Sequence, residues 1–500
     1  MILGIDLGTM YSVAAYVDDA GHPQIITNLN GEEKTPSVVL FEDEDSVVVG
    51  RTAKEHMYTR PNDIVTFVKK SMGTGVVFTP SNGKEYTPEV VSSFILKKIV
   101  SDAEKQLGTK ITDVAVTVPA TFNDVQRKAT MDAVKIAGLN LCALIDEPVA
   151  AAYYYSEKCK ISHANILTYD IGGGMFETAI INVKESAVTL KNKKGLADLG
   201  GSLWDEKIVE YIRQYIENKY DVDITDDVDY CLDLYSKVEN AKIQLCDLKA
   251  VRVTIVIAEK GIRESITITR ALLNKIIEKD IKRTKNRIKV LQEEADMEME
   301  EFDRVILIGG STKIPYIQDF VKDYTGKILS FEVNPDLVVA QGAALYANFL
   351  LKQKNEEKVE RKVIHDVSSH GIGIKDYIDG KFVNDILIKA NTKLPAEAES
   401  GFCTVNENQK VIEIWITEGD NSLITDVSII AKVKFSLETE IKQKTKGIIR
   451  VKIDEFNIVH LFVEIPELNY KDEIVIKRET NFGAEDITEY SRVITKCEVN

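Results

Sequence analysis

One stretch of the sequence combines a carboxylate with three consecutive glycines between two apolar runs. Residues 166–171 read ILTYDI, glycines occupy positions 172–174, and residues 176–181 are again largely apolar. Glycines let a backbone approach a ligand closely, and successive amides can form a concave anion site. Asp170, at the end of the first run, could hold a hydrated Mg²⁺ ion. The pattern indicates a strand–turn–strand unit for metal-bound phosphate, although a merely flexible glycine hairpin explains this one stretch about as well.

A second stretch repeats the plan at the start of the sequence. An apolar run at 2–5 leads to Asp6, the following turn contains Gly8 and Thr9, and residues 11–17 are again mostly apolar. Two such hairpins could face each other and clamp a phosphate chain between related halves. Because internal duplication is a signal at the level of the fold, the repeat favours phosphate binding over the flexible hairpin.

Composition narrows the class of protein. The chain has 500 residues, of which 44% are hydrophobic, and this length is enough for roughly three domains. The formal charge of −16 argues against a general binder of nucleic acid or of anionic membranes, because such binding needs clustered Lys and Arg. The six cysteines are scattered without metal-ligand spacing, as is typical of a reduced protein. The first residues do not resemble a signal peptide, and no apolar run could span a bilayer, so we expect a cytoplasmic protein.

Strand and helix patterns alternate up to about residue 350, which indicates an α/β fold. A helix is predicted over 87–107, with Thr87 as its N-cap and Pro88 at the first helical position. A second is predicted from 123 to 137, before Gly138. Further helices are predicted after 201, at about 226–247 and at about 270–299, and strands at 113–118, 166–171, 177–183, 251–257, 264–268 and 304–308.

After the mixed-charge run at 351–362 the pattern changes to period-two alternation. Residues 411–418 alternate between two faces, as do 449–453 and 459–465, and turn clusters separate these runs. This alternation predicts a separate all-β domain, most simply a compact sandwich. The last stretch, from about 479, has room for a short helix at most.

Seven motifs follow one another in a specific order: GIDLGT at 4–9, VPATFND at 118–124, EPVAAA at 147–152, YDIGGG at 169–174, LGG at 199–201, GGST at 309–312 and NPD at 334–336. In combination, order and spacing they resemble the 70-kDa heat-shock proteins, the DnaK-like chaperone family, up to about residue 478. The resemblance implies an actin-like, duplicated two-lobed ATPase domain with ribonuclease H-like halves, followed by an all-β sandwich that binds extended peptides. We therefore expect a nucleotide-binding domain at 1–355, a linker at 356–367, the sandwich at 368–478 and a short tail at 479–500 without a full helical lid.

The resemblance also implies roles for individual residues. Asp6 and Asp170 would hold Mg²⁺ through water, and Lys69, Glu147, Asp170 and Thr9 would be the catalytic residues. The residues implied in binding ATP or ADP are Gly8, Thr9, Met10, Tyr11, Gly172, Gly173, Gly174, Gly200, Gly201, Glu239, Lys242, Cys246, Gly309, Gly310, Ser311, Lys313 and Asp336. By residue type alone, Lys69 would be a surface lysine, so its role rests on the resemblance.

Four positions depart from the family pattern in the nucleotide site. Met10 and Met175 each replace a threonine, Glu177 replaces an aspartate, and Cys246 replaces a serine. Met175 removes a hydroxyl group close to where the γ-phosphate would lie. Backbone amides supply most of the phosphate cradle, so we expect ATP binding to be kept and hydrolysis to be slow.

The implied partners are unfolded or extended polypeptide segments and a nucleotide-exchange factor. Pro119 and Arg127 match the family's relay between domains, and the linker keeps part of its apolar character. Ala143 and Asp146 replace residues that help a J-domain partner to dock, which argues against such a partner. Without the lid, we expect weak and fast-exchanging peptide binding. The peptide site can be placed only within 371–453, because a register slip of one residue exchanges the faces of a strand.

Four functions remain open at this point. The first is an ATP-driven peptide-binding chaperone. The second, motivated by Met10 and Met175, is a module that binds ATP as a switch with little turnover. A small-molecule kinase on the same fold is less favoured, because the β-domain offers no obvious acceptor pocket. A filament former like actin is less favoured still, because such chains lack the extra domain.

Overall fold

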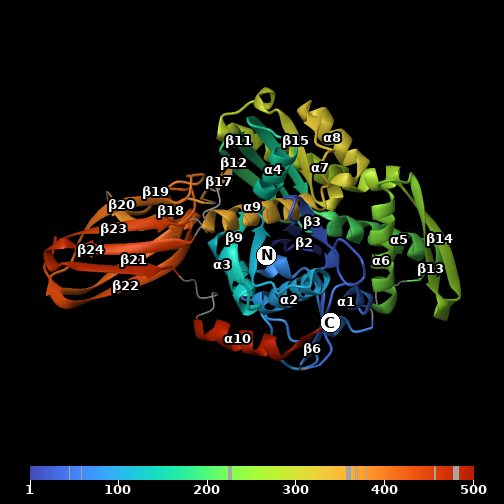
Figure 1. Cartoon of the computed structure of the whole chain (residues 1–500), viewed down its shortest axis with the longest axis horizontal. Coiled ribbons are helices and arrows are strands. Elements are labelled where there is room, and N and C mark those ends of the chain that lie inside the picture. Colours follow the sequence, from blue (N-terminus) through green and yellow to red (C-terminus); the bar gives the residue numbers. More distant parts are fainter. Residues whose placement is uncertain are drawn as a thin grey trace.

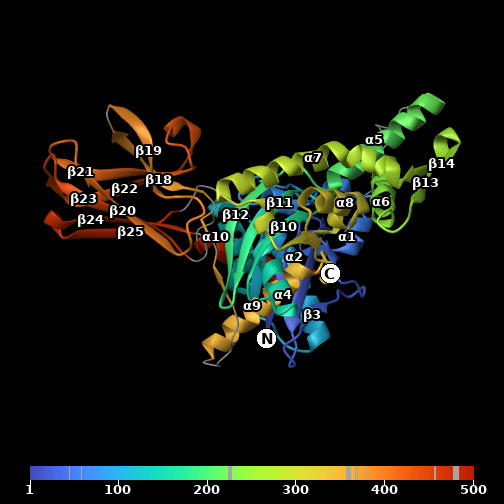
Figure 2. The same ribbon diagram turned by 90° about the horizontal axis from the view of Figure 1, so that it is seen from above.

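The computed structural model of the chain describes residues 1–43, 45–57, 59–222, 228–355, 362–365, 367–368, 370–378, 380–454, 458–476 and 484–500. It consists of an α/β body and a β-sandwich that projects from one side of this body in both views (Figure 1 and Figure 2). Of the helices described, none is both long enough and apolar enough to cross a membrane.

Two six-stranded mixed sheets form the centre of the α/β body. The strands of the first sheet are, in spatial order, β3 (Pro23–Ile26), β2 (Tyr11–Val17), β1 (Ile2–Asp6), β8 (Asp113–Val118) and β9 (Asn140–Asp146), with β4 (Thr35–Pro36) paired to β2. Those of the second are β16 (Ile328–Leu329), β15 (Arg304–Ile308), β10 (Ala164–Ile171), β11 (Phe176–Lys184), β12 (Ala187–Leu196) and β17 (Val363–His365).

The two sheets share one local plan. In each, the first strand of an antiparallel hairpin, β1 or β10, also pairs in parallel with a later strand, β8 or β15. These central strands are apolar and buried almost throughout, as expected for strands covered on both faces. The plan places Asp6 and Asp170 at the carboxyl ends of equivalent strands, so both carboxylates reach the same edge of their sheets.

Two helices, α4 (Glu147–Lys158) and α9 (Val338–Lys354), pack against each other between the sheets. Small residues make this close approach possible. A Cβ atom on Gly342 would lie 1.9 Å from the carbonyl oxygen of Ala150, and one on Gly4 would lie 2.0 Å from the amide nitrogen of Ala344. The Ala-rich and Gly-rich character of these segments therefore sets how near the two sheets can come.

The remaining elements of the body lie around the two sheets. We call β1–β9 with α1–α3 (residues 1–146) the first lobe and β10–β16 with α5–α8 and the segment up to the start of α9 (residues 164–337) the second lobe. The first lobe adds α1 (Arg51–Glu55), α2 (Pro88–Leu107) and α3 (Asp124–Ile136), together with β5 (Val39–Phe41), β6 (Ser46–Val49) and β7 (Ile64–Val65). The second adds α5 (Gly201–Tyr220), α6 (Val228–Gln244), α7 (Arg270–Ala295), α8 (Pro315–Thr325) and the hairpin of β13 (Ala250–Ile257) and β14 (Ile262–Thr269).

Local signals predict several of these elements correctly. The Thr87 side chain accepts a hydrogen bond from the Val90 amide and starts α2, and Asn123 and Gln126 form a capping box that starts α3. Helix α7 ends at Ala295, earlier than the predicted 299. Strand β12 was not predicted, because its lysines at 191, 193 and 194 hide the buried positions between them.

Two four-stranded antiparallel sheets form the sandwich. Their strands are β19 (Lys381–Ile388), β18 (Ile372–Ile378), β21 (Gln409–Glu418) and β22 (Ser428–Ile441) in one sheet, and β20 (Ala396–Cys403), β23 (Lys446–Ile453), β24 (Val459–Ile465) and β25 (Tyr470–Val475) in the other. Isoleucine, valine and leucine side chains from both inner faces build a single core. Of the predicted linker at 356–367, residues 356–361 and 366 lie outside the described part of the chain.

The segment after the sandwich packs on the first lobe. Of the predicted tail, residues 479–483 lie outside the described part, whereas α10 (Ala484–Lys496) contacts α2 and α3 (Figure 1). The following strand, β26 (Glu498–Val499), pairs in parallel with β6, and Asn500 accepts a hydrogen bond from the Val49 amide. Ile494 and Cys497 are buried in the core of the first lobe, and the Lys97 ammonium group donates to both of their carbonyl oxygens. The short helix expected from the sequence thus becomes part of the first lobe's core.

Neighbouring side chains on α10 allow a matched test of this docking. Ile494 is 1% exposed and Val493 is 40% exposed. We expect Ile494→Ala to weaken the docking by about 2–5 kcal/mol, because it removes buried methylene groups, and Val493→Ala to have little effect. Hydrogen exchange of the Val49 amide, which bonds to Asn500, measures the change. Equal protection of that amide in both variants would contradict the docking.

Candidate functional site

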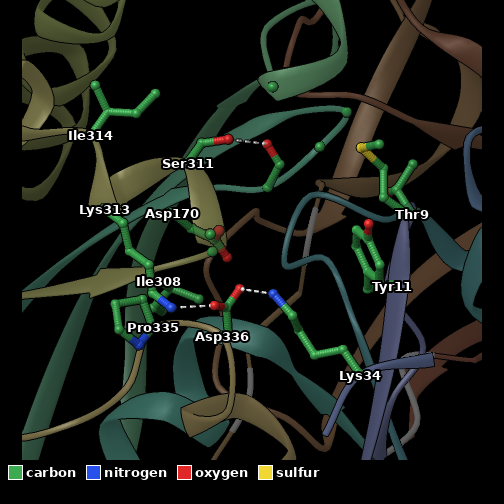
Figure 3. A pocket seen from close by; sticks show the side chains of 18 of the residues that line it. Thr9, Tyr11, Lys34, Asp170, Ile308, Ser311, Lys313, Ile314, Pro335 and Asp336 are labelled. Carbon is green, nitrogen blue, oxygen red and sulfur yellow. Dashed lines mark hydrogen bonds and ion pairs between the residues drawn. The ribbon is translucent and has the colours of Figure 1, made fainter. Parts of the chain in front are cut away.

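A cavity of about 710 Å³ lies between the two lobes, at the edge where both hairpin turns emerge (Figure 3). All but one of the site residues expected from the sequence line it: Asp6, Gly8, Thr9, Met10, Tyr11, Lys69, Glu147, Asp170, Gly172, Gly173, Gly174, Gly201, Glu239, Lys242, Cys246, Gly309, Gly310, Ser311, Lys313 and Asp336. Gly200 lies behind the glycine turn, where a Cβ atom would be 2.6 Å from the Gly173 carbonyl oxygen.

Hydrogen bonds to the start of α5 hold the glycine turn. The carbonyl oxygens of Gly172 and Gly173 accept from the amides of Gly201 and Ser202 at 3.0 and 2.9 Å, and the Ser311 hydroxyl donates to Gly172 at 3.0 Å. The N–H and C=O groups of a trans peptide point in opposite directions. The amides of Gly173 and Gly174 therefore point away from α5, as a phosphate cradle requires.

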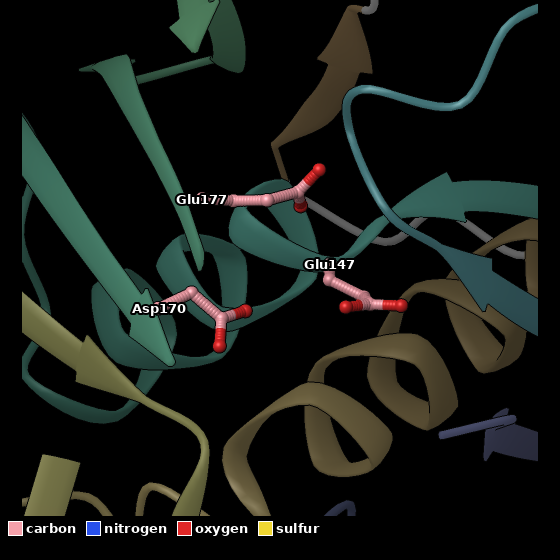
Figure 4. Close-up of side chains that lie close together, drawn as sticks. All are labelled: Glu147, Asp170 and Glu177. Atoms are coloured by element: carbon pink, nitrogen blue, oxygen red, sulfur yellow. The ribbon is translucent and has the colours of Figure 1, made fainter. Parts of the chain in front are cut away.

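Acidic side chains from both lobes meet at one end of the cavity. One carboxylate oxygen each from Glu147, Asp170 and Glu177 lies within 4.8 Å of the others (Figure 4). Glu147 opens α4 directly after β9, Asp170 is the penultimate residue of β10, and Glu177 lies on β11. The Lys69 ammonium group lies 2.5 Å from a Glu147 oxygen. Together with Asp6, four carboxylates thus share one buried ammonium group.

Burial and mutual repulsion shift the pKa values of these groups. Burial, reinforced by Glu147, raises the pKa of Asp6 and that of Glu177 to about 7, and the same causes raise the pKa of Asp170 well above its ordinary value. Burial alone would lower the pKa of Lys69, but the Glu147 and Asp6 carboxylates outweigh it and raise that pKa. The cluster thus holds more carboxylates than one ammonium group can balance, and carboxylate oxygens are the ligands that Mg²⁺ prefers. The residues fit the metal that the sequence analysis expects.

The longer side chain of Glu177 reaches across to the first lobe. Its carboxylate accepts hydrogen bonds from the amides of Ala120 and Thr121, at 3.1 and 2.9 Å, and from the Thr121 hydroxyl. These residues directly follow Pro119. Glu177 therefore connects the glycine hairpin of the second lobe to the segment that the resemblance associates with domain coupling.

Asp146 points into the protein rather than toward a partner. It is 2% exposed and pairs with the guanidinium group of Arg127 and, at 3.4 Å, with the Lys193 ammonium group. Lys193 comes from β12 of the second lobe, and sequence reasoning missed it. This buried ion triad holds the turn from β9 into α4 and so supports the backbone of Glu147.

Two ion pairs cross the cavity mouth between the lobes. Lys54 lies 2.6 Å from Glu239, which also accepts a hydrogen bond from the Tyr11 hydroxyl at 3.0 Å. Lys34 lies 3.2 Å from Asp336, which also pairs with Lys313 (Figure 3). Sequence reasoning missed both cross-lobe lysines, because nothing local distinguishes them from surface lysines.

Lys242 and several apolar side chains complete the wall of the cavity. The Lys242 ammonium group bonds to the Gly201 carbonyl oxygen at 2.8 Å and pairs with Asp205 at 2.5 Å. Ile243, Ile314 and Phe331 add apolar surface near Lys313 and Cys246, as a flat aromatic base requires. The sequence offered no signal for Ile243, which sits on the polar side of its helix.

The raised carboxyl pKa values predict how Mg²⁺ and pH act together. The folded chain holds protons on Asp6 and Glu177 that the unfolded chain releases above their ordinary pKa values. Without metal, this contribution to folding stability is present at low pH and is lost as pH rises toward about 7. We therefore expect excess Mg²⁺ to raise the melting temperature more at about pH 8 than at about pH 6.

Thermal unfolding with Mg²⁺ or with a chelator measures this effect, and Glu177→Gln serves as the control that removes one titrating group. The pH dependence of the Mg²⁺ effect should be smaller in this variant. Identical stabilisation by Mg²⁺ at both pH values in the unaltered protein would contradict the charge assignment.

Comparison with known proteins identifies the chain's relatives. The family model described as Hsp70 protein matches residues 2–79 and 74–498. These two overlapping segments cover nearly the whole sequence and confirm the resemblance inferred from the seven motifs. The chain belongs to the Hsp70 family, whose members are ATPases that act as chaperones.

Proposed function

We propose that this protein is an ATP-dependent chaperone in which ATP binding and slow hydrolysis control the affinity for extended polypeptides. Its α/β body would be an actin-like ATPase built from two duplicated lobes. The observation that carries the proposal is the meeting of both glycine hairpins, Lys69 and the acidic cluster in one cavity between the lobes. A phosphate chain in that cavity would face backbone amides from both hairpins.

Different residues of the cavity would have different roles in hydrolysis. Asp6 and Asp170 would hold Mg²⁺ through water, and the ion would neutralise charge on the phosphates. Lys69 would contact the γ-phosphate and the attacking water, while Glu147, held by Lys69 at 2.5 Å, would orient that water. Attack on phosphorus forms a new P–O bond and breaks the bond to the bridging oxygen, leaving ADP and phosphate. Catalysis of this kind depends on positioning and electrostatics.

Contacts between the ATPase body and the sandwich support coupling of the two. Strand β17, which lies between them in the sequence, pairs with β12 at the edge of the second sheet, and Val367 is buried beside α4 and α9. β12 also carries Lys193 of the buried ion triad. Movement of one lobe against the other would therefore be transmitted to β17. A nucleotide-exchange factor would be a partner that opens the cavity, and it would do so by separating the two ion pairs across the cavity mouth.

A second function is favoured by Met10. Its side chain crosses from the first hairpin to the second, so that a Cβ atom on Gly173 would lie 2.3 Å from its sulfur. A thioether in this position offers no hydrogen bond donor to phosphate. This contact supports a module that binds ATP as a switch ligand with little turnover.

Removal of the Lys69 ammonium group separates these two functions. We expect Lys69→Ala to slow single-turnover hydrolysis of ATP by about a hundredfold, because a buried charge at the reacting phosphate is lost, while ATP still binds. Lys105→Ala, on the exposed end of α2, is the control and should leave the rate unchanged. Equal turnover in wild type and Lys69→Ala would contradict the ATPase proposal and favour the switch.

Lys34 provides a test of how the cavity is kept closed. Lys34→Met removes the ion pair with Asp336 across the mouth. Because Lys34 is about a third exposed, the pair contributes less than about 1 kcal/mol, and we expect a fluorescent ATP analogue to dissociate about two to five times faster. Arg51→Met, which removes a pair with Glu32 inside the first lobe, should not change the rate measured by stopped flow. Faster release in the control alone would contradict a closing role for Lys34.

A further inference from the structure

Alternating aromatic rings and ammonium groups cross the outer face of the sheet formed by β19, β18, β21 and β22. The Lys375 ammonium group lies 4.2 Å from the centre of the Phe382 ring and 3.8 Å from that of Trp415, and the Lys432 ammonium group lies 4.1 Å from Trp415. Tyr377 packs edge-on against Phe382 with ring centres 5.1 Å apart. We call these five residues the aromatic–lysine stripe.

The stripe is open to solvent and carries two ammonium groups that form no ion pair in the part of the chain that the structure describes. Tyr377 and Phe382 are 62% and 56% exposed. Within the described residues, neither Lys375 nor Lys432 forms an ion pair, although the Trp415 indole N–H and Lys434, helped by the charge of Lys432, lower the pKa of Glu413. The neighbouring Glu413 is engaged by the Trp415 indole N–H at 2.6 Å and by Lys434 at 3.3 Å. Two ammonium groups are thus held over aromatic rings, where cation–π attraction orients them without neutralising them.

One end of the stripe opens into a groove of about 1270 Å³ between the sandwich and the first lobe. Lys432 lines the groove together with two partly exposed apolar side chains, Ile429 and Val475. On the opposite wall lies Met72, which directly follows η2 (Val68–Ser71), the turn that carries Lys69. Strand β22 is an edge strand, so its outer backbone groups have no strand partner in the sandwich.

We propose that the aromatic–lysine stripe selects extended polypeptides in which acidic residues flank an apolar or aromatic core. Their carboxylates would pair with Lys375 and Lys432, and their apolar side chains would pack on the exposed rings. This inference rests on the proposed peptide-binding function and names its substrate class. The three strand spacings that the stripe crosses, about 4.8 Å each, match about four residues of extended chain.

Charge complementarity favours this occupant over the alternatives. Basic flanks would be repelled by the two unpaired lysines, and neutral flanks would leave their charge without a partner. A nucleic acid strand could also stack on Trp415 and Phe382. However, the net charge of −16 on the protein repels a polyanion that carries a phosphate at every nucleotide. An acidic peptide brings only a few carboxylates and places them at the lysines.

Three fluorescent peptides with one apolar core and acidic, neutral or basic flanks test the proposal on the full chain. We expect the acidic peptide to bind about tenfold more tightly than the neutral one, the basic peptide to bind most weakly, and added salt to reduce these differences. Trp415 gives a direct readout, because the second tryptophan, Trp204, is fully buried in the second lobe. Acidic peptide should therefore change the emission of Trp415.

Lysine variants on the same face of the sheet provide the matched control. Lys375→Met with Lys432→Met should abolish the preference for acidic flanks and leave neutral peptide binding intact. Lys434→Met removes the same charge from the same face, but its ammonium group is already paired with Glu413, so the preference should remain. Circular dichroism and ATP binding confirm that each variant is folded.

The outcomes separate this inference from the proposed function. Binding of all three peptides with equal affinity, or loss of the preference in Lys434→Met to the same degree, would overturn the acidic selectivity and leave the chaperone proposal standing. Failure of every peptide to bind would overturn the chaperone proposal itself. Displacement of acidic peptide by a short single-stranded oligonucleotide at equal concentration would overturn the choice of occupant.

Discussion

Four carboxylates around one buried ammonium group are the constraint on which the rest of this structure depends. Asp6, Glu147, Asp170 and Glu177 come from elements far apart in the sequence, and Lys69 alone offsets them within the cluster. Bringing like charges together under apolar cover is costly. The packing of the surrounding sheets and helices must offset this cost and hold the carboxylates together.

The packing that enforces this meeting uses the smallest side chains of the chain. Helices α4 and α9 approach each other and strand β1 at positions where glycine or alanine is required. Glu147 is carried on the first turn of α4, and its position therefore follows from that packing. The buried triad of Asp146 with Arg127 and Lys193 joins the same turn to the second lobe, so the geometry of the acidic end of the cavity depends on both lobes together.

The segments before and after the sandwich also connect it to both lobes. Strand β17 joins the second sheet before the sandwich begins, and α10 with β26 joins the first lobe after it ends. The sandwich is thus attached to one lobe by the segment that precedes it and to the other by the segment that follows it. Relative movement of the lobes about the nucleotide cavity would act on both attachments. Glu177, which accepts hydrogen bonds from Ala120 and Thr121, provides a third connection, from the acidic end of the cavity toward the groove beside the sandwich.

The sequence by itself determined those features that depend on interactions between residues close together in the chain. The two glycine hairpins, the caps of α2 and α3, the alternation in the sandwich and the positions of Asp6 and Asp170 at strand ends follow from backbone geometry and side-chain period over a few residues. Only the tertiary structure decided which distant charges meet. Lys34, Lys54 and Lys193 resemble surface lysines in sequence, strand β12 is masked by its own lysines, and α10 with β26 shows nothing that marks the first lobe as its docking site. Their partners lie many residues away along the chain, and electrostatic and packing contacts at that separation leave no periodic or compositional trace in either segment.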